Sequence, residues 1–162
     1  MPNESSPPLK PPIVTLIGIV GLPEISPGHD LAALIAEAAQ SQGTPLQNKD
    51  VLVITQKVVS KAEGRIVNLD DVEPSRFAKT FAQEWDKDPR HIEVILQESH
   101  RIVRMEKGVL ITETRHGIRC ANAGVDASNL PESNTVSLLP VNPDESACTL
   151  RKDVWKHTGA EV

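Results

Sequence analysis

The chain has 162 residues, enough for one ordinary domain with its own core. Apolar residues make up 39% and charged residues 24%, a balance typical of soluble globular proteins. The formal net charge of −5 and the scarcity of aromatic residues argue against a nucleic-acid-binding face built from positive charge and base stacking. An anionic ligand would need a local cluster of Lys and Arg.

The sequence has no apolar run of membrane-spanning length, and its first residues lack the basic start and apolar segment of a signal peptide. We therefore expect a cytoplasmic protein with no membrane partner. Cys120 and Cys148 lie far apart and show no metal-binding spacing, so we expect both thiols to stay reduced and structural.

The first elements follow from composition and capping signals. Residues 1–12 include five prolines and two serines and are expected to form a disordered tail. Ile13–Val20 and Asp50–Thr55 are apolar and rich in β-branched residues, which predicts two buried strands. Between them, Asp30 is a candidate N-cap for an amphipathic helix that ends before Gly43.

Two segments that follow these strands could meet a ligand. The loop Gly21-Leu22-Pro23-Glu24 could present backbone N–H groups, although its glycine and proline could simply terminate the strand. Lys57, Lys61 and Arg65 concentrate positive charge just past the second strand, where α/β proteins bind anions, although a solvated loop would look the same. The chain has no Walker A pattern, so a nucleotide would need a different cradle.

The middle of the chain reads as two helices. Glu73-Pro-Ser75 opens the first, and its stripe of Phe77, Phe81 and Trp85 is interpreted as packing. Asp88-Pro89 opens the second, which the apolar spacing extends to about Gly108. His91 and His100, which lie on this helix, are expected to carry no chemistry.

The last third mixes strands with a helix. Val109–Thr112 and Ile118–Ala121 should flank a turn at His116-Gly117 as a hairpin. The further elements expected here are a strand at Val136–Pro140, a helix from Asn142-Pro143-Asp144 to Gly159, and a new strand starting at Ala160–Val162. The whole pattern predicts an α+β fold, a mixed β-sheet with amphipathic helices.

Asn122–Asn129 is dense in small and polar residues. Such a loop lets the backbone approach a ligand closely and leaves Asp126 and Asn129 free to point at it. A carboxylate three residues from an amide suits a hard cation and the phosphates it carries. The alternative is an Asx-rich turn in which both side chains merely cap backbone groups.

The segment Glu113–Asn129 closely resembles the signature of the coenzyme F420:L-glutamate ligases, which use GTP to add glutamate to the tail of a deazaflavin coenzyme. Gly21–Glu24 and Ser60–Arg65 agree with the same family in order and spacing. The similarity runs from about Ile13 to the last residue.

The resemblance implies roles for particular residues. The positions that it assigns to GTP are Gly21, Leu22, Pro23, Glu24, Gln56, Lys57, Lys61 and Asn129. It assigns Asp126 to Mg²⁺ or Mn²⁺ and makes Lys61 and Asp126 the catalytic pair, with K⁺ as a further cation. It also implies a homodimer, with L-glutamate and the deazaflavin precursor as the other substrates.

The reaction so implied needs little covalent help from the protein. The γ-phosphate of GTP activates a carboxylate as an acyl phosphate, and the amine of L-glutamate then forms the amide bond. Catalysis of such a transfer is mostly positioning and charge neutralisation, so no nucleophile or general base is required.

The resemblance covers the first part of the ligase pattern. In that family, the strand expected from Ala160 onward leads to an Asp-Thr pair that completes the metal site. We therefore expect residues 13–162 to be the nucleotide- and metal-binding domain of such a ligase. The alternative is a non-catalytic nucleotide-binding module, or half of a split enzyme that needs a partner chain.

Overall fold

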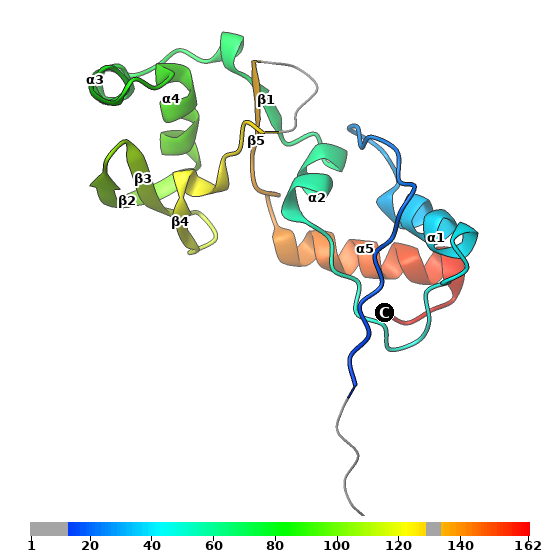
Figure 1. Cartoon of the computed structure of the whole chain (residues 1–162). Coiled ribbons are helices and arrows are strands. Elements are labelled where there is room, and N and C mark those ends of the chain that lie inside the picture. Colours follow the sequence, from blue (N-terminus) through cyan, green and yellow to red (C-terminus); the bar gives the residue numbers. More distant parts are fainter. Residues whose placement is uncertain (1–12, 129–133) are drawn as a thin grey trace, which may run out of the picture.

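The computed structural model describes residues 13–128 and 134–162 (Figure 1). The expected tail, residues 1–12, lies outside this part of the chain. The helices are α1 (Leu31–Ser41), α2 (Gln56–Ala62), α3 (Arg76–Trp85), α4 (Pro89–Glu98) and α5 (Pro143–Thr158), with 3-10 turns η1 (Leu69–Asp71) and η2 (Asn122–Gly124). The strands are β1 (Ile66–Asn68), β2 (Ser99–Glu106), β3 (Val109–Thr114), β4 (Arg119–Ala121) and β5 (Thr135–Ser137).

This combination of helices and sheets confirms the α+β class. One sheet has the order β2-β3-β4 and the other pairs β1 with β5, and all these pairs are antiparallel. The expectation of a mixed sheet is therefore wrong for the described residues. Parallel pairing would have involved the two early strands, and these do not form.

Neither predicted buried strand is buried: only Ile19 of the first and Leu52 and Ile54 of the second are even partly buried, against the core at α1 and α2. Ile13–Val20 and Asp50–Thr55 are extended, but within the described residues neither is assigned to a strand. Leu16 is 92% exposed and Val53 is 85% exposed. Their β-branched side chains favour an extended backbone, whereas burial additionally requires a neighbouring strand to pair with.

The predicted helix ends are confirmed at four helices. Asp30, Ser75, Asp88 and Asn142 each cap a helix by accepting a hydrogen bond from a backbone N–H group in its first turn. Gly159 ends α5 with a φ of 73°, in the left-handed region that glycine tolerates best. The sequence predicts these helix ends because each capping residue acts on backbone groups only a few residues away.

The second central helix is shorter than predicted. It ends at Glu98, and Ser99–Glu106 forms β2, which turns through Lys107 and Gly108 into β3. Both turn residues have positive φ, 48° and 76°, as a tight hairpin turn requires. Ile102 and Val103 fit a helical stripe by spacing, but pairing with β3 decides in favour of the strand.

Two smaller predictions hold only in part. Phe81 is buried and stacks on Phe77. Phe77 and Trp85 are 43% and 37% exposed, so only Phe81 of the aromatic stripe is buried in the core. The strand expected at Val136–Pro140 is Thr135–Ser137. Ala160–Val162 forms no strand, although the Glu161 carbonyl accepts a hydrogen bond from the Lys49 N–H at 2.8 Å.

The described residues form two apolar cores, which lie on opposite sides of the β1–β5 pair (Figure 1). The first core joins α3 and α4 to Leu110 of β3 and Val136 of β5, with Ile95 of α4 fully buried among them. The second core is smaller and joins α1 and α2 around Ile35 and Val59. No helix in the described part of the chain is both long and apolar enough to cross a membrane.

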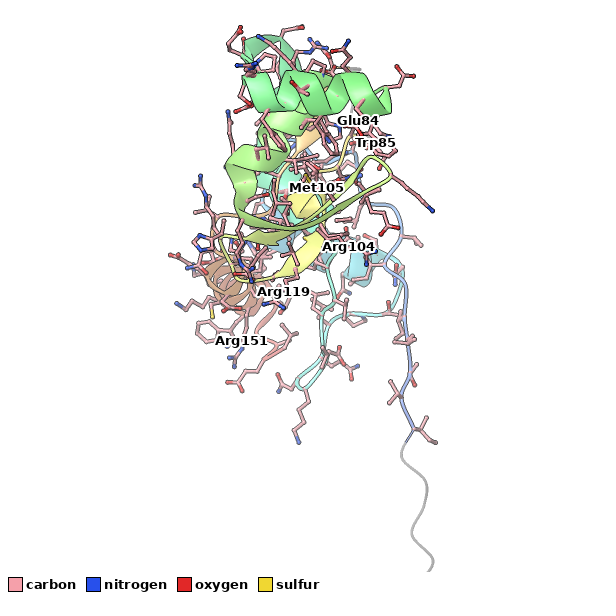
Figure 2. The ribbon with its side chains drawn as sticks, turned by 90° about the vertical axis from the view of Figure 1, so that its left-hand side faces the viewer. Glu84, Trp85, Arg104, Met105, Arg119 and Arg151 are labelled. Atoms are coloured by element: carbon pink, nitrogen blue, oxygen red, sulfur yellow. The ribbon has the colours of Figure 1, made fainter. Side chains whose placement is uncertain are left out.

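The outer face of the three-stranded sheet is solvated. Arg101 and Arg119 both pair with Glu113 across the strands. Figure 2 labels Arg104 and Met105 of β2 and Arg119 of β4 on this side of the molecule. The arginines of this face pair with neighbouring carboxylates, since Arg104 also pairs with Glu106.

Candidate functional site

Helix α2 organises the candidate site. It starts directly after the extended segment 50–55. Lys57 and Lys61, for which a solvated loop was the alternative, are therefore helical. The helical spacing of four residues places Lys57 and Lys61 one turn apart on the same face. Val59, on the opposite side, is buried, as is Ser60, and both anchor the helix.

The first of these lysines reaches the predicted metal-binding carboxylate. Lys57 Nζ lies 2.5 Å from Asp126 Oδ2. It also donates to the carbonyl oxygen of Ser128 at 2.6 Å and to Ser128 Oγ at 2.9 Å. The structure therefore joins α2 to a loop 71 residues further along the chain.

Asp126 is held firmly and stays ionised. Its backbone exchanges hydrogen bonds of 3.0 and 2.8 Å with the buried Ser137 of β5. Its Oδ1 accepts from Ser128 N–H at 2.9 Å and from Ser128 Oγ at 2.8 Å. The hydrogen bond from Lys57, aided by those from Ser128, lowers the pKa of the Asp126 carboxyl to about 2. The side chain remains 42% exposed, so a ligand can reach it.

The turn before Asp126 requires unusual backbone conformations. Asn122, Ala123 and Gly124 have successive positive φ values of 53°, 53° and 72°. A side chain at Gly124 would also meet Leu139 Cδ2 at 2.8 Å, closer than real contacts allow. The small residues that the sequence shows here therefore serve the backbone path that delivers Asp126 to the site.

The second lysine ties the Gly-Leu-Pro loop to α2. Lys61 is buried at 7% exposure, and its Nζ contacts Glu24 Oε1 at 2.5 Å. Glu24 itself is largely exposed, as are Gly21, Leu22 and Pro23. The buried Ile25 anchors the loop from beneath.

Gln56 and Arg65 turn to structural partners. Gln56 Nε2 donates to Ser60 Oγ at 2.7 Å and to the carbonyl of Leu138 at 2.9 Å. Arg65 Nε donates to the carbonyl of Leu139, and its Nη2 pairs with Glu98 at 3.0 Å. Both side chains contact the exit of β5, and Arg65 also reaches Glu98 of α4.

Comparison with known proteins identifies the family. The family model described as F420-0:gamma-glutamyl ligase matches residues 19–162, most of the chain. The chain belongs to this family. The similarity that the motif segments suggested is therefore confirmed.

Three relatives of this family member are coenzyme F420:L-glutamate ligases. The protein of Methanopyrus kandleri is 50% identical over 139 residues, which is 86% of this chain and 53% of the relative. That of Methanothermobacter thermautotrophicus is 40% identical, over 92% of this chain and 59% of the relative. That of Methanocaldococcus jannaschii is 43% identical, over 73% and 47%. The chain spans about half the length of the curated relatives it matches.

In this F420 ligase family member, the structure brings together Glu24, Lys57, Lys61 and Asp126. Asn129 lies outside the described residues. The sequence analysis gave Ser128 no role, although Ser128 contacts both Lys57 and Asp126 in the site. The Asp-x-Ser spacing of a side-chain turn was the signal that could have found it.

Two of these residues, Glu24 and Asp126, carry the carboxylates that hard metal ions favour. Among residues 13–128 and 134–162, no group of three His, Cys, Asp or Glu side chains gathers around one point. Mg²⁺ usually keeps several waters and is held by one or two carboxylates together with substrate phosphates. The exposed and ionised Asp126 fits an ion of this kind that arrives with a nucleotide.

Proposed function

We propose that this chain supplies the nucleotide- and metal-binding part of a ligase that adds L-glutamate to the coenzyme F420 precursor, driven by GTP. The observation that supports the proposal best is the convergence of two distant segments on α2. Glu24 meets Lys61, and Asp126 meets Lys57, each over 2.5 Å. Two ammonium groups one turn apart are suited to phosphates, and a carboxylate beside them is suited to the cation that phosphates carry.

The proposed chemistry proceeds through an acyl phosphate. A carboxylate is a poor acyl donor, so the γ-phosphate is transferred to it first, and the amine of L-glutamate then displaces phosphate. Lys61 neutralises phosphate charge, and the exposed loop Gly21–Glu24 borders the nucleotide. Asp126 holds Mg²⁺ or Mn²⁺, which stabilises the developing negative charge when bound. Neither lysine needs to lose its proton in this scheme.

Calorimetric titration with GTP and Mn²⁺ tests the proposal on the chain itself, with ATP as the competing nucleotide. We expect binding that requires the metal and favours GTP. Asp126→Asn preserves the size of the side chain but removes its charge, and should abolish the metal requirement. Asp144→Asn, on the exposed start of α5, is the matched control and should bind as the unaltered chain does. Equal binding by the Asp126 variant would remove this residue from the site.

A second candidate function is favoured by the exposed apolar segments 13–20 and 51–55. In it, the chain is a nucleotide-binding module, or part of a split enzyme, that works only with a partner chain. Mass spectrometry of the deazaflavin product after incubation with GTP, Mn²⁺ and L-glutamate separates the two. Ligation by the chain alone rules out the second function. Ligation only after addition of the remaining part of a relative supports the second.

We further propose that K⁺ assists charge neutralisation and that the protein acts as a homodimer. Sedimentation velocity at several protein concentrations tests the dimer. Replacement of K⁺ by Na⁺ in the calorimetric titration tests the monovalent ion, since a true requirement would weaken nucleotide binding.

A further inference from the structure

The ammonium group of Lys57 is saturated with hydrogen bonds. An ammonium has three N–H donors and no acceptor. Three oxygens surround this one: Asp126 Oδ2 at 2.5 Å, the Ser128 carbonyl at 2.6 Å and Ser128 Oγ at 2.9 Å. Lys57 therefore cannot donate to a nucleotide phosphate unless it first gives up one of these partners.

The same three oxygens form a cage suited to a cation. Carboxylate, carbonyl and hydroxyl oxygens are the ligand types that hard metal ions take from proteins. A divalent ion on Asp126 would lie within a few ångströms of the ammonium, where the repulsion between the two positive charges is strong. The lysine and the metal therefore exclude each other from this carboxylate.

We propose that Lys57 is an exchangeable internal cation, which occupies the oxygen cage of Asp126 and Ser128 until a metal–nucleotide complex displaces it. This inference rests on the proposed nucleotide and metal site. Once displaced, the ammonium is free to reach the phosphates that arrive with the metal. One lysine thus keeps the empty site neutral and then contributes its charge to the bound nucleotide.

Ser128 is the positioning residue of this exchange. Its N–H and hydroxyl both donate to Asp126 Oδ1, whereas Lys57 contacts Oδ2. Departure of Lys57 therefore frees one carboxylate oxygen while the other stays hydrogen-bonded. The hydroxyl accepts from Lys57 and donates to Asp126 simultaneously, so it can keep its bond to Asp126 after the lysine has left.

The test measures the binding of Mn²⁺ alone, by electron paramagnetic resonance of the free ion, on the unaltered chain and on Lys57→Gln. We expect the variant to bind Mn²⁺ about tenfold more tightly, because the Lys57 ammonium no longer competes with the ion for the Asp126 carboxylate. Lys57→Arg keeps the charge and should leave Mn²⁺ affinity low. Lys79→Gln is the control. It removes an exposed lysine of α3 that pairs with Glu73, and it should leave the Mn²⁺ affinity unchanged.

A second measurement separates the exchange from the proposed function. Calorimetry with Mn²⁺ and GTP together should show weaker nucleotide binding in Lys57→Gln, because the displaced ammonium is no longer available to the phosphates. Unchanged Mn²⁺ affinity in Lys57→Gln overturns the exchange, even if the unaltered chain binds Mn²⁺ with GTP. Gain of Mn²⁺ affinity without any GTP binding supports the exchange and overturns the nucleotide function.

Adding Ser128→Ala to Lys57→Gln tests the positioning role. The double variant retains the carboxylate and should lose most of the gained Mn²⁺ affinity, because Asp126 Oδ1 loses its hydroxyl donor and the cage loses an oxygen. Thermal unfolding of each variant shows whether it folds. A double variant that folds and binds Mn²⁺ as tightly as Lys57→Gln alone would remove Ser128 from the inference.

Discussion

The two cores of the molecule differ in how completely they are covered. In the core around α3 and α4, Ile95 of α4, Leu110 of β3 and Val136 of β5 are at most 1% exposed. The core beneath α1 and α2 borders extended segments whose Leu16 and Val53 are 92% and 85% exposed. Both regions are built from the same Leu, Ile and Val residues, so composition does not explain the difference.

Chain topology explains it better. Strands β2, β3 and β4 follow one another in sequence, and short turns let them pair antiparallel. The segments 13–20 and 51–55 are separated by α1, so neither can reach the other through a tight turn. Beside the segment 51–55 lies an apolar cavity of about 530 Å³, lined among others by Leu52, Ile54 and Leu150. The core around α3 and α4 is covered by its own strands and helices, whereas the core beneath α1 and α2 leaves neighbouring apolar side chains exposed.

The largest expected effect comes from the same substitution made in both regions. Val136→Ala removes two buried methyl groups at a fully packed position and should lower the free energy of unfolding by about 2–3 kcal/mol. Val53→Ala makes the identical change at an exposed position and should stay within about 0.5 kcal/mol. Urea unfolding measures both. Similar losses at the two sites would mean that Val53 is covered in solution.

The sequence predicted local features of both regions well. Asp30 and Asn142-Pro143 were identified as helix starts because a cap bonds to the backbone only a few residues away. The hairpin turn at His116-Gly117 was found for the same reason. By contrast, the spacing of Ile102 and Val103 fits either a helix or a strand, and only pairing with β3 decided between them.

Features that depend on distant partners were not predictable in this way. The extended backbone of Ile13–Val20 follows from its residue types, but its exposure depends on which strands are available to pair with it. The contact of Lys57 with Asp126 joins segments that no local rule connects. Residue types singled out both residues and the family resemblance assigned their roles, but their mutual contacts, with Ser128 between them, required coordinates.

A network of charged side chains makes the stability of the region around α3 and α4 depend on pH. Asp88 caps α4 and pairs with Arg90, whose Nη1 reaches Asp70 at 2.8 Å. The side-chain hydrogen bond from Arg90 lowers the pKa of Asp88 from its ordinary value of 3.8. A lowered carboxyl pKa stabilises the fold above the unfolded value, and this stabilisation is lost as the pH falls through the folded value.

Replacement of this carboxyl should therefore weaken the acid dependence of stability. Asp88→Asn keeps a capping oxygen but loses the ion pair, which predicts a loss of about 1 kcal/mol at pH 7. The difference from the unaltered chain should shrink as the pH falls from about 4, the unfolded value, through the lowered pKa of the native Asp88 carboxyl. Glu84→Gln, on the exposed side of α3 (Figure 2), is the control. A difference that stays constant with pH would contradict the pKa assignment.

The smallest effect on stability, and the most direct test of the open region, comes from charging its exposed apolar side chains. Leu16→Lys with Val53→Lys should change the free energy of unfolding by no more than about 0.5 kcal/mol, because both positions already face solvent. Exposed extended segments with apolar side chains invite pairing with other chains, so the double variant should associate less in sedimentation experiments. Thr15→Lys adds charge at an exposed position that is not apolar and should leave association almost unchanged. If the double variant unfolds more easily instead, these segments are buried in solution and the contrast between the two regions disappears.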